Sequence, residues 1–519
     1  MSIRLFDTTL RDGTQREGVS LTTDDKIRIA RELDTLGLNY IEAGFPTSNP
    51  KDLEFFENFD VAELENARLV AFTRARRPGG SAEDDPAVTL LPRLSAPVAC
   101  IVAKSWKLHI EKVLRAAIEE NLASVRDTVG YLKAAGKEVI FDAEHYFDGF
   151  RDDPEYALSV LRTAAEAGAT TLVLCDTNGG TLPTELKAVV GRTVREFPGV
   201  ELGIHTHNDA GCGVANALAA VEAGATHVQG TVNGVGERCG NCDLVTTIAN
   251  LQLKMGLKIL DDERLRRLTE VSNYVSELMN LTPDSHRPYV GHSAFAHKGG
   301  LHMDGILKDP ATYEHVPPEQ VGNVRRTPVG ELSGKNSIRA KAEELGLYAV
   351  DIAAILSAIK QREYEGYHYE AADASLALLI GRTTGDTKPL FELETFRIIS
   401  EKKADGQTNT EATVKLLVKG QRVISTAEGN GPVNALDRAL RQAIGPHYPE
   451  LKEIHLSNYK VRILDEHRAT AATTRVLIDS TDGKHVWGAV GVGENIIEAS
   501  WQALVDGLEY GVNAAPEKR

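Results

Sequence analysis

Two histidines, an asparagine and an aspartate follow one another closely in the stretch GIHTHNDAG, which runs from Gly203 to Gly211. Successive side chains on a strand point to opposite faces, so His205 and His207 share one face while Thr206 turns to the other. Two imidazoles on one face can bind a single metal ion. The same residues could instead form a polar strand end that meets solvent. The choice depends on what else lies beside this strand.

The first 280 residues repeat one pattern, in which a short apolar run leads through a polar or glycine-rich turn into an amphipathic segment. The apolar runs begin at Ile3, Tyr40, Arg68, Val98, Glu138, Thr170, Glu201 and His227. Eight strand–helix units over roughly 250 residues predict an α/β fold, the (β/α)₈ TIM barrel. A doubly wound open sheet is the rival, but it usually has fewer strands and a GxGxxG opening after the first strand, which is missing.

Polar residues gather where the predicted barrel strands end, which is where active sites of this fold lie. They form DTTLRDGTQ after the first strand, DAEH at the fifth, CDTNGG at the sixth, HTHND at the seventh and NGVGERCGN after the eighth. The strand interiors are expected to be apolar. Strands one, seven and eight close the barrel side by side, so Asp12 is a candidate third metal ligand. Asn241 is a candidate fourth ligand or a partner that supports the others. Such ligands suit Mg²⁺, Mn²⁺ or Co²⁺, and also Zn²⁺.

Other residues at the barrel mouth have a functional and a structural interpretation. Glu144 could act as an acid, a base or an orienting group, or could simply be solvated. Arg11 could stabilise an oxyanion or form a salt bridge with Asp12. Thr177 could bind a substrate carboxylate or cap a turn. In AHKGGLHMDGI, His302 is an acid/base candidate on a glycine-rich loop.

The pattern changes after the barrel. Residues 281–385 read as a mainly helical connector that contributes to the active site, and residues 386–519 as an α+β domain. In that domain strands lead twice into a Gly-x-Gly turn and an amphipathic helix, first at Glu428 and again at Val490. This internal repeat predicts pseudo-twofold symmetry and a module for small-molecule binding or dimerisation. The C-x-x-C spacing of Cys239 and Cys242 has neither a second pair nor a redox context, so coincidence is favoured.

Composition excludes several classes of protein. A net charge of −16 argues against nucleic-acid binding. The N-terminus has no signal-peptide pattern, and no stretch is long and apolar enough to span a membrane. Five cysteines without a disulfide framework fit a reducing compartment, so we expect a cytoplasmic protein.

The motifs DTTLRDGTQ, HTHND, GERCGN and GLHMDG, with the two-copy C-terminal domain, resemble the DRE-TIM metallolyase family. Within it, the chain resembles the 2-isopropylmalate, homocitrate and citramalate synthase branch over nearly its whole length. FDAEHYFDG, LCDTNGG and QGTVNGVGERCGN are most similar to the subgroup that condenses acetyl-CoA with pyruvate and water. Asp142 departs from that subgroup, some of whose members place an aromatic residue there.

The resemblance implies a role for each matching position. It assigns the metal to Asp12, His205, His207 and Asn241. It assigns substrate binding and charge stabilisation to Arg11, Gln15, Thr177 and Asp304, and removal of the acetyl methyl proton to Glu144, His302 and Tyr313. It further implies that His302 reaches the barrel of a partner subunit in a homodimer or higher oligomer, and that isoleucine binds the C-terminal domain.

Other functions remain open at this stage. A sibling synthase would use 2-oxoisovalerate or 2-oxoglutarate, and few apolar pocket residues decide between them. A carbon–carbon lyase would typically lack the C-terminal domain. A metal-dependent hydrolase barrel would usually carry its H-x-H near the first strand, and a non-enzymatic amino-acid sensor would leave the polar barrel rim without a purpose.

Overall fold

The computed structural model describes residues 2–326, 328–329, 335–344, 351–465, 467 and 471–513. These residues form two compact units. Unit 1 consists of Met1–Phe295 with Val316–Val324, and unit 2 of Ala296–His315 with Arg325–Arg519.

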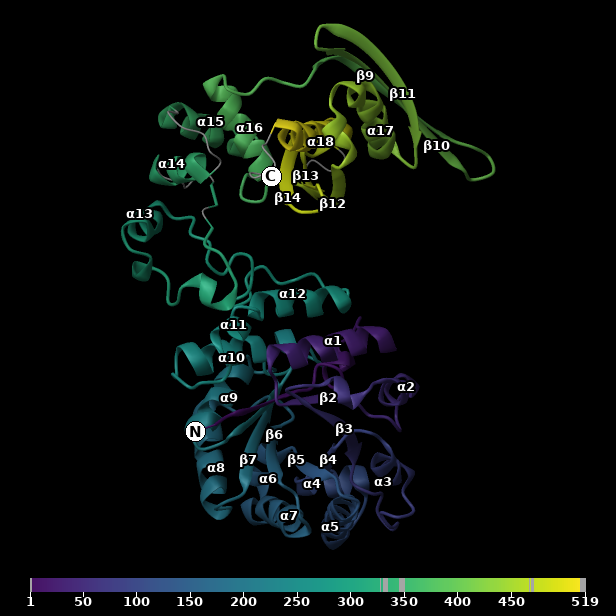
Figure 1. Cartoon of the computed structure of the whole chain (residues 1–519), viewed down its shortest axis with the longest axis vertical. Helices are drawn as coiled ribbons and strands as arrows, with labels where there is room; N and C mark the ends of the chain where they lie inside the picture. The colour runs from purple at the N-terminus through teal and green to yellow at the C-terminus, as the bar shows by residue number, and fades with distance from the viewer. Residues whose placement is uncertain are drawn as a thin grey trace. The chain divides into compact units, whose positions relative to one another are not determined.

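Unit 1 is built on a closed barrel of parallel strands in the order β1 to β8, which confirms the predicted TIM barrel (Figure 1). β8 pairs with β1, and Arg4 lies opposite His227 in this closing pair. The strands are β1 Arg4–Asp7, β2 Tyr40–Gly44, β3 Arg68–Arg74, β4 Val98–Lys104, β5 Glu138–Glu144, β6 Thr171–Asp176, β7 Glu201–Thr206 and β8 His227–Gly230.

Helices surround the barrel, and the first shows how the sequence sets their ends. Thr22 and Asp25 form a capping box at the start of α1 Thr23–Leu36, and Gly37 ends it with a φ of 94°. The other helices of the unit are α2 Pro50–Asn58, α3 Pro86–Thr89, α4 Lys107–His109, α5 Ile118–Ala134, α6 Tyr146–Asp152, α7 Pro154–Ala167, α8 Pro183–Glu196, α9 Gly213–Glu222, α10 Leu244–Leu253, α11 Asp262–Leu265 and α12 Leu268–Leu278.

Two sets of buried side chains alternate along the barrel strands. One set, which includes Leu5, Ile41 and Leu69, packs against the helices. The other set lines the inside of the barrel and consists of Phe6, Tyr40, Val70, Phe72, Val98, Cys100, Ile140, Val173 and Cys175. The expectation of wholly apolar strand interiors is wrong, because Glu42, Asp142 and Gln229 are also buried within strands.

Unit 2 begins with helices and ends with two antiparallel three-stranded sheets. The helices are α13 Gly300–Lys308, α14 Lys335–Glu344, α15 Ile352–Tyr364 and α16 Asp373–Thr384. The first sheet, in the order β11-β10-β9, comprises β9 Glu392–Lys402, β10 Thr408–Val418 and β11 Gln421–Gly429, and α17 Pro432–Ile444 follows it. The second, in the order β12-β13-β14, comprises β12 His455–Ile463, β13 Thr474–Thr481 and β14 Val486–Gly493, and α18 Ile496–Asn513 follows it. The predicted repeat of strands and helix is confirmed.

Ion pairs join α16 to α18 within unit 2. Arg382 contacts Asp506 at 2.9 Å and Glu509 at 2.5 Å. Glu509 is buried, and its other oxygen accepts a hydrogen bond from the backbone N–H of Leu390. The helix before residue 386 therefore packs on the last helix of the chain. The boundary between connector and C-terminal domain at residues 385 and 386 stays a prediction.

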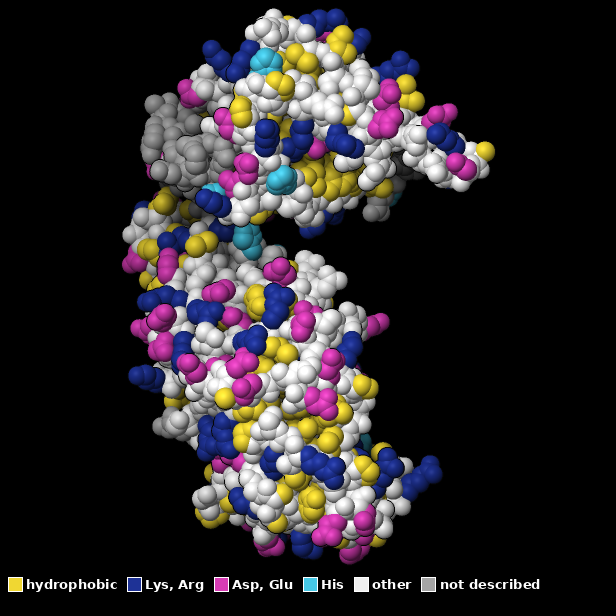
Figure 2. Space-filling view, turned by 45° about the vertical axis from the view of Figure 1, so that its right-hand side comes forward, with side chains coloured by type: hydrophobic (Ala, Val, Ile, Leu, Met, Phe, Trp, Pro, Cys, Tyr) yellow, Lys and Arg dark blue, Asp and Glu magenta, His cyan; other side chains and the backbone are white. Residues whose placement is uncertain are grey.

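The surface carries both signs of charge. On the face shown in Figure 2, acidic and basic side chains are interspersed over the barrel unit rather than gathered by sign. None of the helices in the described part of the chain combines the length and the apolar character that crossing a membrane requires.

Candidate metal centre and active site

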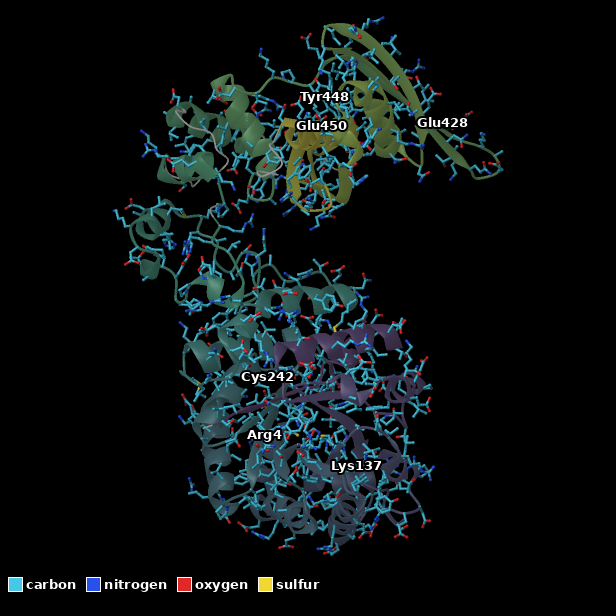
Figure 3. All side chains as sticks on the ribbon, in the orientation of Figure 1. Arg4, Lys137, Cys242, Glu428, Tyr448 and Glu450 are labelled. Atoms are coloured by element: carbon cyan, nitrogen blue, oxygen red, sulfur yellow. The ribbon has the colours of Figure 1, made fainter. Side chains whose placement is uncertain are left out.

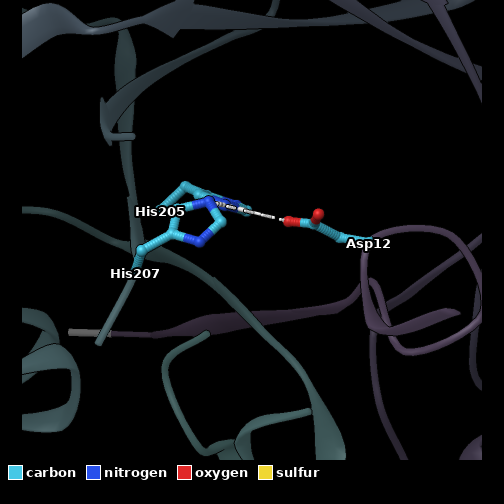
Figure 4. Close-up of side chains that lie close together, drawn as sticks. All are labelled: Asp12, His205 and His207. Carbon is cyan, nitrogen blue, oxygen red and sulfur yellow. Dashed lines mark hydrogen bonds and ion pairs between the residues drawn. The ribbon is translucent and has the colours of Figure 1, made fainter. Parts of the chain in front are cut away.

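Asp12, His205 and His207 converge inside the barrel mouth, and all three are buried (Figure 4). One ligand atom from each lies within 4.8 Å of the other two. His205 Nε2 is 3.3 Å and His207 Nε2 is 3.9 Å from Asp12 Oδ2. Within the described residues, no other group of three or more His, Cys, Asp and Glu side chains meets this criterion.

Local structure explains this convergence. His205 in β7 and His207 just after it lie on one face, while the Thr206 hydroxyl turns away and donates to the carbonyl of Gly213 at 2.9 Å. Asp12 lies in the turn after β1, where its N–H points to the hydroxyl of Thr8 at 3.3 Å. Since β1 pairs with β8, and β8 with β7, closure of the barrel brings the two segments together.

The electrostatics of the cluster favour a metal-binding state. Burial alone would raise the pKa of Asp12, but Arg11 and the two imidazoles outweigh it and hold this pKa well below its usual range. Burial, reinforced by His205, lowers the pKa of His207 to about 4. Burial acts downward on the pKa of His205 too, but its hydrogen bond to Asp12 prevails and raises it. Near neutral pH the cluster thus contains an ionised carboxylate and at least one neutral imidazole, which are the forms that bind metals.

An unpartnered atom beside the cluster also fits a bound cation. Asn241 Oδ1 is buried without a hydrogen-bond partner among the described residues. Asn241 is held in place because its amide donates to the carbonyl of Val235 at 3.2 Å, and it pairs with His207 through a single β-bridge. A buried amide oxygen that accepts no hydrogen bond destabilises the folded chain, unless another group such as a cation interacts with its lone pair. The residues present therefore fit a divalent ion.

Arg11 is fixed on two sides beside the cluster. Its Nε donates to Glu42 at 2.7 Å, and its guanidinium lies 4.0 Å from the centre of the Phe72 ring. Its Nη1 is 3.5 Å from Asp12 Oδ1, so the alternative of a salt bridge is also present. Glu42 also accepts a hydrogen bond from Thr8 at 2.5 Å, which makes it an anchor for the whole turn after β1.

The remaining predicted residues of unit 1 lie around the mouth. Glu144 forms an ion pair with Lys104 of β4 and is partly exposed. Thr177 accepts a hydrogen bond from the N–H of His145 at 2.9 Å, and its role in substrate binding stays a prediction. Gln15 is exposed at the end of a 3₁₀ turn, Gly13–Gln15.

The predicted residues of the connector belong to unit 2. His302 and Tyr313 are exposed, and their rings stack with centroids 4.3 Å apart. Asp304 forms an ion pair with Lys308 at 2.6 Å. The roles of these three residues in the active site stay predictions.

The cysteines of the C-x-x-C stretch differ in environment. Cys242, labelled in Figure 3, is buried, and its sulfur lies 3.1 Å from the hydroxyl of Thr247. Cys239 is exposed, and both cysteines are free. This arrangement agrees with a coincidental spacing.

Three polar residues near the centre were not predicted from the sequence. The side-chain oxygen of Gln229 lies 2.9 Å from His205 Nδ1. Lys104 forms an ion pair with Glu144, and Glu42 forms one with Arg11. Each is a polar residue in or at the end of an apolar strand, within YIEAGF, VACIVAK and HVQG. The contrast between each polar residue and its apolar neighbours was the signal that the sequence offered.

Comparison with known proteins follows the same division of the chain. Residues 2–275 match the HMGL-like family, and residues 289–365 match a homocitrate synthase post-HMGL domain-like family. Residues 370–512 match the LeuA allosteric (dimerisation) domain. The predicted resemblance is thereby confirmed.

Curated relatives match over nearly the full length. An (R)-citramalate synthase of Streptomyces coelicolor is 52% identical, with 98% of this chain and 97% of the relative covered. Those of Aquifex aeolicus and Synechocystis are 49% and 48% identical, with 98% of this chain and 97% and 96% of the relatives covered. By these matches the chain belongs to the HMGL-like family, in the branch to which these synthases belong.

Proposed function

We propose that the chain is an (R)-citramalate synthase, an acyltransferase that condenses acetyl-CoA with pyruvate and water to give (R)-citramalate and CoA. The supporting observation is the convergence of Asp12, His205 and His207 into one buried cluster at the barrel mouth. The full-length relatives named (R)-citramalate synthase, at 42% to 52% identity, support the choice of reaction.

In this proposal Asp12, His205 and His207 hold a divalent ion, and Asn241 completes or supports the set. Mg²⁺, Mn²⁺, Co²⁺ and Zn²⁺ all accept such nitrogen and oxygen ligands. A divalent ion bound there supplies Lewis-acid polarisation of the keto group of pyruvate. Arg11, held by Glu42 and Phe72, stabilises the oxygen that gains negative charge.

The other assigned residues bind substrate and move a proton. Thr177, Gln15 and Asp304 bind the substrates, with Thr177 at the pyruvate carboxylate. Glu144, with His302 and Tyr313, takes a proton from the acetyl methyl group. The carbon that loses the proton forms the new bond to the keto carbon, and water then cleaves the thioester and releases CoA. The roles of His302, Tyr313 and Asp304 rest on the family resemblance alone.

Regulation and assembly follow from the C-terminal match to an allosteric dimerisation domain. We infer a homodimer or higher homo-oligomer in which His302 serves the barrel of a partner subunit. We also infer that isoleucine, the end product of the route that citramalate would enter, is the effector. A cytoplasmic location agrees with the cysteines, all five of which are free.

A thiol-release assay tests the proposal. The metal-free chain is supplied with acetyl-CoA, one divalent ion and pyruvate, 2-oxobutyrate, 2-oxoisovalerate or 2-oxoglutarate in turn. We expect metal-dependent release of CoA with a strong preference for pyruvate. Equal or faster turnover of 2-oxoisovalerate would replace the assignment by 2-isopropylmalate synthase, and no release with any of the four would refute a synthase.

A further inference from the structure

Beneath the metal cluster, a row of buried polar side chains crosses the barrel interior from β5 to β8. Asp142, Gln229 and His205 expose 3%, 1% and 5% of their surfaces. Gln229 Nε2 lies 3.1 Å from Asp142 Oδ1, and Gln229 Oε1 lies 2.9 Å from His205 Nδ1. None of these contacts is needed to close the barrel, because the strands already pair through their backbones.

The direction of this row is fixed at its carboxylate end. Gln229 Nε2 donates to Asp142 Oδ1 over 3.1 Å, and a carboxylate only accepts hydrogen bonds. Gln229 must therefore turn its NH₂ group toward Asp142. Its carbonyl oxygen then faces His205, and an oxygen accepts only from an imidazole nitrogen that carries a hydrogen.

The consequence reaches the metal position. In its charged form His205 also carries a hydrogen on Nε2, which faces Asp12. Once that hydrogen is lost, the hydrogen held on Nδ1 leaves the lone pair on Nε2. His205 Nε2 is the atom that lies 3.3 Å from Asp12 Oδ2 and 3.3 Å from His207 Nε2. We propose that Asp142 and Gln229 form a hydrogen-bond relay that holds His205 in the tautomer whose Nε2 can bind the metal. The inference rests on the metal site of the proposed function and makes Asp142 and Gln229 positioning residues.

Reversal of the relay would have the opposite effect. If Gln229 turned its amide round, its NH₂ group would face His205 Nδ1 and would require a lone pair there. The hydrogen would then lie on Nε2 and block the metal position. The substitution Asp142→Asn permits this reversal, because the new side-chain amide can donate to Gln229 Oε1 while it keeps the shape of aspartate.

Metal titration of the full-length chain tests the relay directly. The metal-free protein is titrated with Co²⁺ at pH 8, and binding is followed by visible absorption. We expect Asp142→Asn to weaken the Kd for Co²⁺ by about 10- to 100-fold, as loss of a partner of a ligating histidine typically does. The double variant Asp142→Asn/Gln229→Glu again requires a hydrogen on His205 Nδ1. The amide introduced at position 142 donates to the carboxylate introduced at position 229, and that carboxylate accepts from His205 Nδ1. Its Kd should return to within about three-fold of the unaltered protein.

A matched control separates the relay from a general loss of stability. Asp34→Asn makes the same change at a buried aspartate of α1, which accepts backbone N–H groups of residues 65 to 67 and lies away from the barrel interior. This variant should bind Co²⁺ with unchanged affinity. If Asp142→Asn does not fold by circular dichroism, Gln229→Leu replaces it and should weaken Co²⁺ binding as strongly.

Two results would overturn the inference. The first is a Kd for Co²⁺ within about two-fold of the unaltered protein in Asp142→Asn, or in Gln229→Leu where that variant replaces it. The second is a double variant that binds Co²⁺ as weakly as Asp142→Asn. The test does not depend on turnover. If no 2-oxo acid supports CoA release while the Co²⁺ titrations follow the expected pattern, the proposed function fails and the relay stands.

Discussion

The Nε2 atoms of His205 and His207 lie 3.3 Å apart, because residues two apart in an extended segment place their side chains on the same face. Without a metal, the two nitrogens can share one hydrogen, which one imidazole donates to the other. A cation bound by both nitrogens and the Asp12 carboxylate would take the place of that hydrogen.

Replacement of either histidine should abolish metal-supported turnover. In His205→Ala or His207→Ala the cluster loses one of its two nitrogen ligands, and we expect CoA release to fall by more than about 100-fold. The measurement is CoA release with pyruvate over a range of Co²⁺ or Mn²⁺ concentrations. His286→Ala, at an exposed histidine of the same unit, serves as the control. Unchanged turnover in His205→Ala or His207→Ala would remove the metal role.

Arg11→Lys should lower kcat because lysine cannot make both contacts that fix the arginine. An ammonium group can replace the charge beside Glu42, but it cannot also lie flat on the Phe72 ring. We expect kcat to fall by at least about 10-fold, as for loss of one oxyanion donor, with little change in Co²⁺ affinity. The exposed Arg28→Lys, which alters a contact with Tyr274, provides the comparison. A normal kcat in Arg11→Lys would show that charge alone is sufficient.

Loss of the Lys104 ammonium group should impair Glu144. Lys104→Met removes the partner that positions this carboxylate at the mouth, whereas Lys104→Arg retains a cation. We expect kcat for Lys104→Met to fall by about 10-fold and for Lys104→Arg to fall less. Lys107→Met, which breaks a similar pair with Asp153, controls for the loss of a surface cation. Equal activity of all three variants would argue against a role of Glu144 in proton transfer.

His227 should make the barrel sensitive to acid. It is fully buried beside Phe6 and Tyr40 with neither ring nitrogen partnered among the described residues, and burial lowers its pKa from 6.5 to about 3. Above pH 6.5 the ring is neutral in both folded and unfolded chains, so stability is fully present there. As the pH falls toward 3, the unfolded chain binds a proton that the folded chain does not, and stability is lost.

The variant His227→Phe removes this titration and keeps an aromatic ring in the same space. At pH 5 the unaltered protein should have lost about 2 kcal/mol through this histidine, whereas the variant should not. Urea denaturation at pH 7.5 and pH 5, followed by circular dichroism, measures the difference. Parallel losses in both proteins between the two pH values would contradict the prediction.

Glu509→Ala should destabilise unit 2. The substitution leaves Arg382 with Asp506 alone and leaves the N–H of Leu390 without its acceptor. Because Arg382 is partly exposed, we expect a loss of about 2 kcal/mol, less than for a fully buried pair. The fluorescence of Trp487 and Trp501 during urea denaturation, measured with Trp106→Phe in every protein compared, reports on this unit. Glu498→Ala, on the exposed side of the same helix, should change the midpoint little, and an equal effect of the two variants would refute the argument.

Periodicity and strand alternation were enough to predict the barrel and the shared face of His205 and His207. The approach of Asp12 followed from the closure of strands one, seven and eight, because that closure is a general property of the fold. The partners of individual polar residues could not be predicted in this way. Asp142 and Gln229 meet across the barrel interior from strands that are not neighbours, and no local pattern encodes such a contact. Lys104 and Glu144 lie opposite each other in the β4–β5 pairing, so their contact required the register.

The ligands come from both sides of the seam that closes the barrel, since Asp12 follows β1, His205 lies in β7 and His207 follows it. A cation bound by all three therefore cross-links the beginning of the barrel to its last quarter. Whatever affinity the folded chain has for that cation is added, by mass action, to the free energy that keeps the seam between β8 and β1 shut. The same three side chains would therefore serve both metal-dependent catalysis and the stability of the closed barrel.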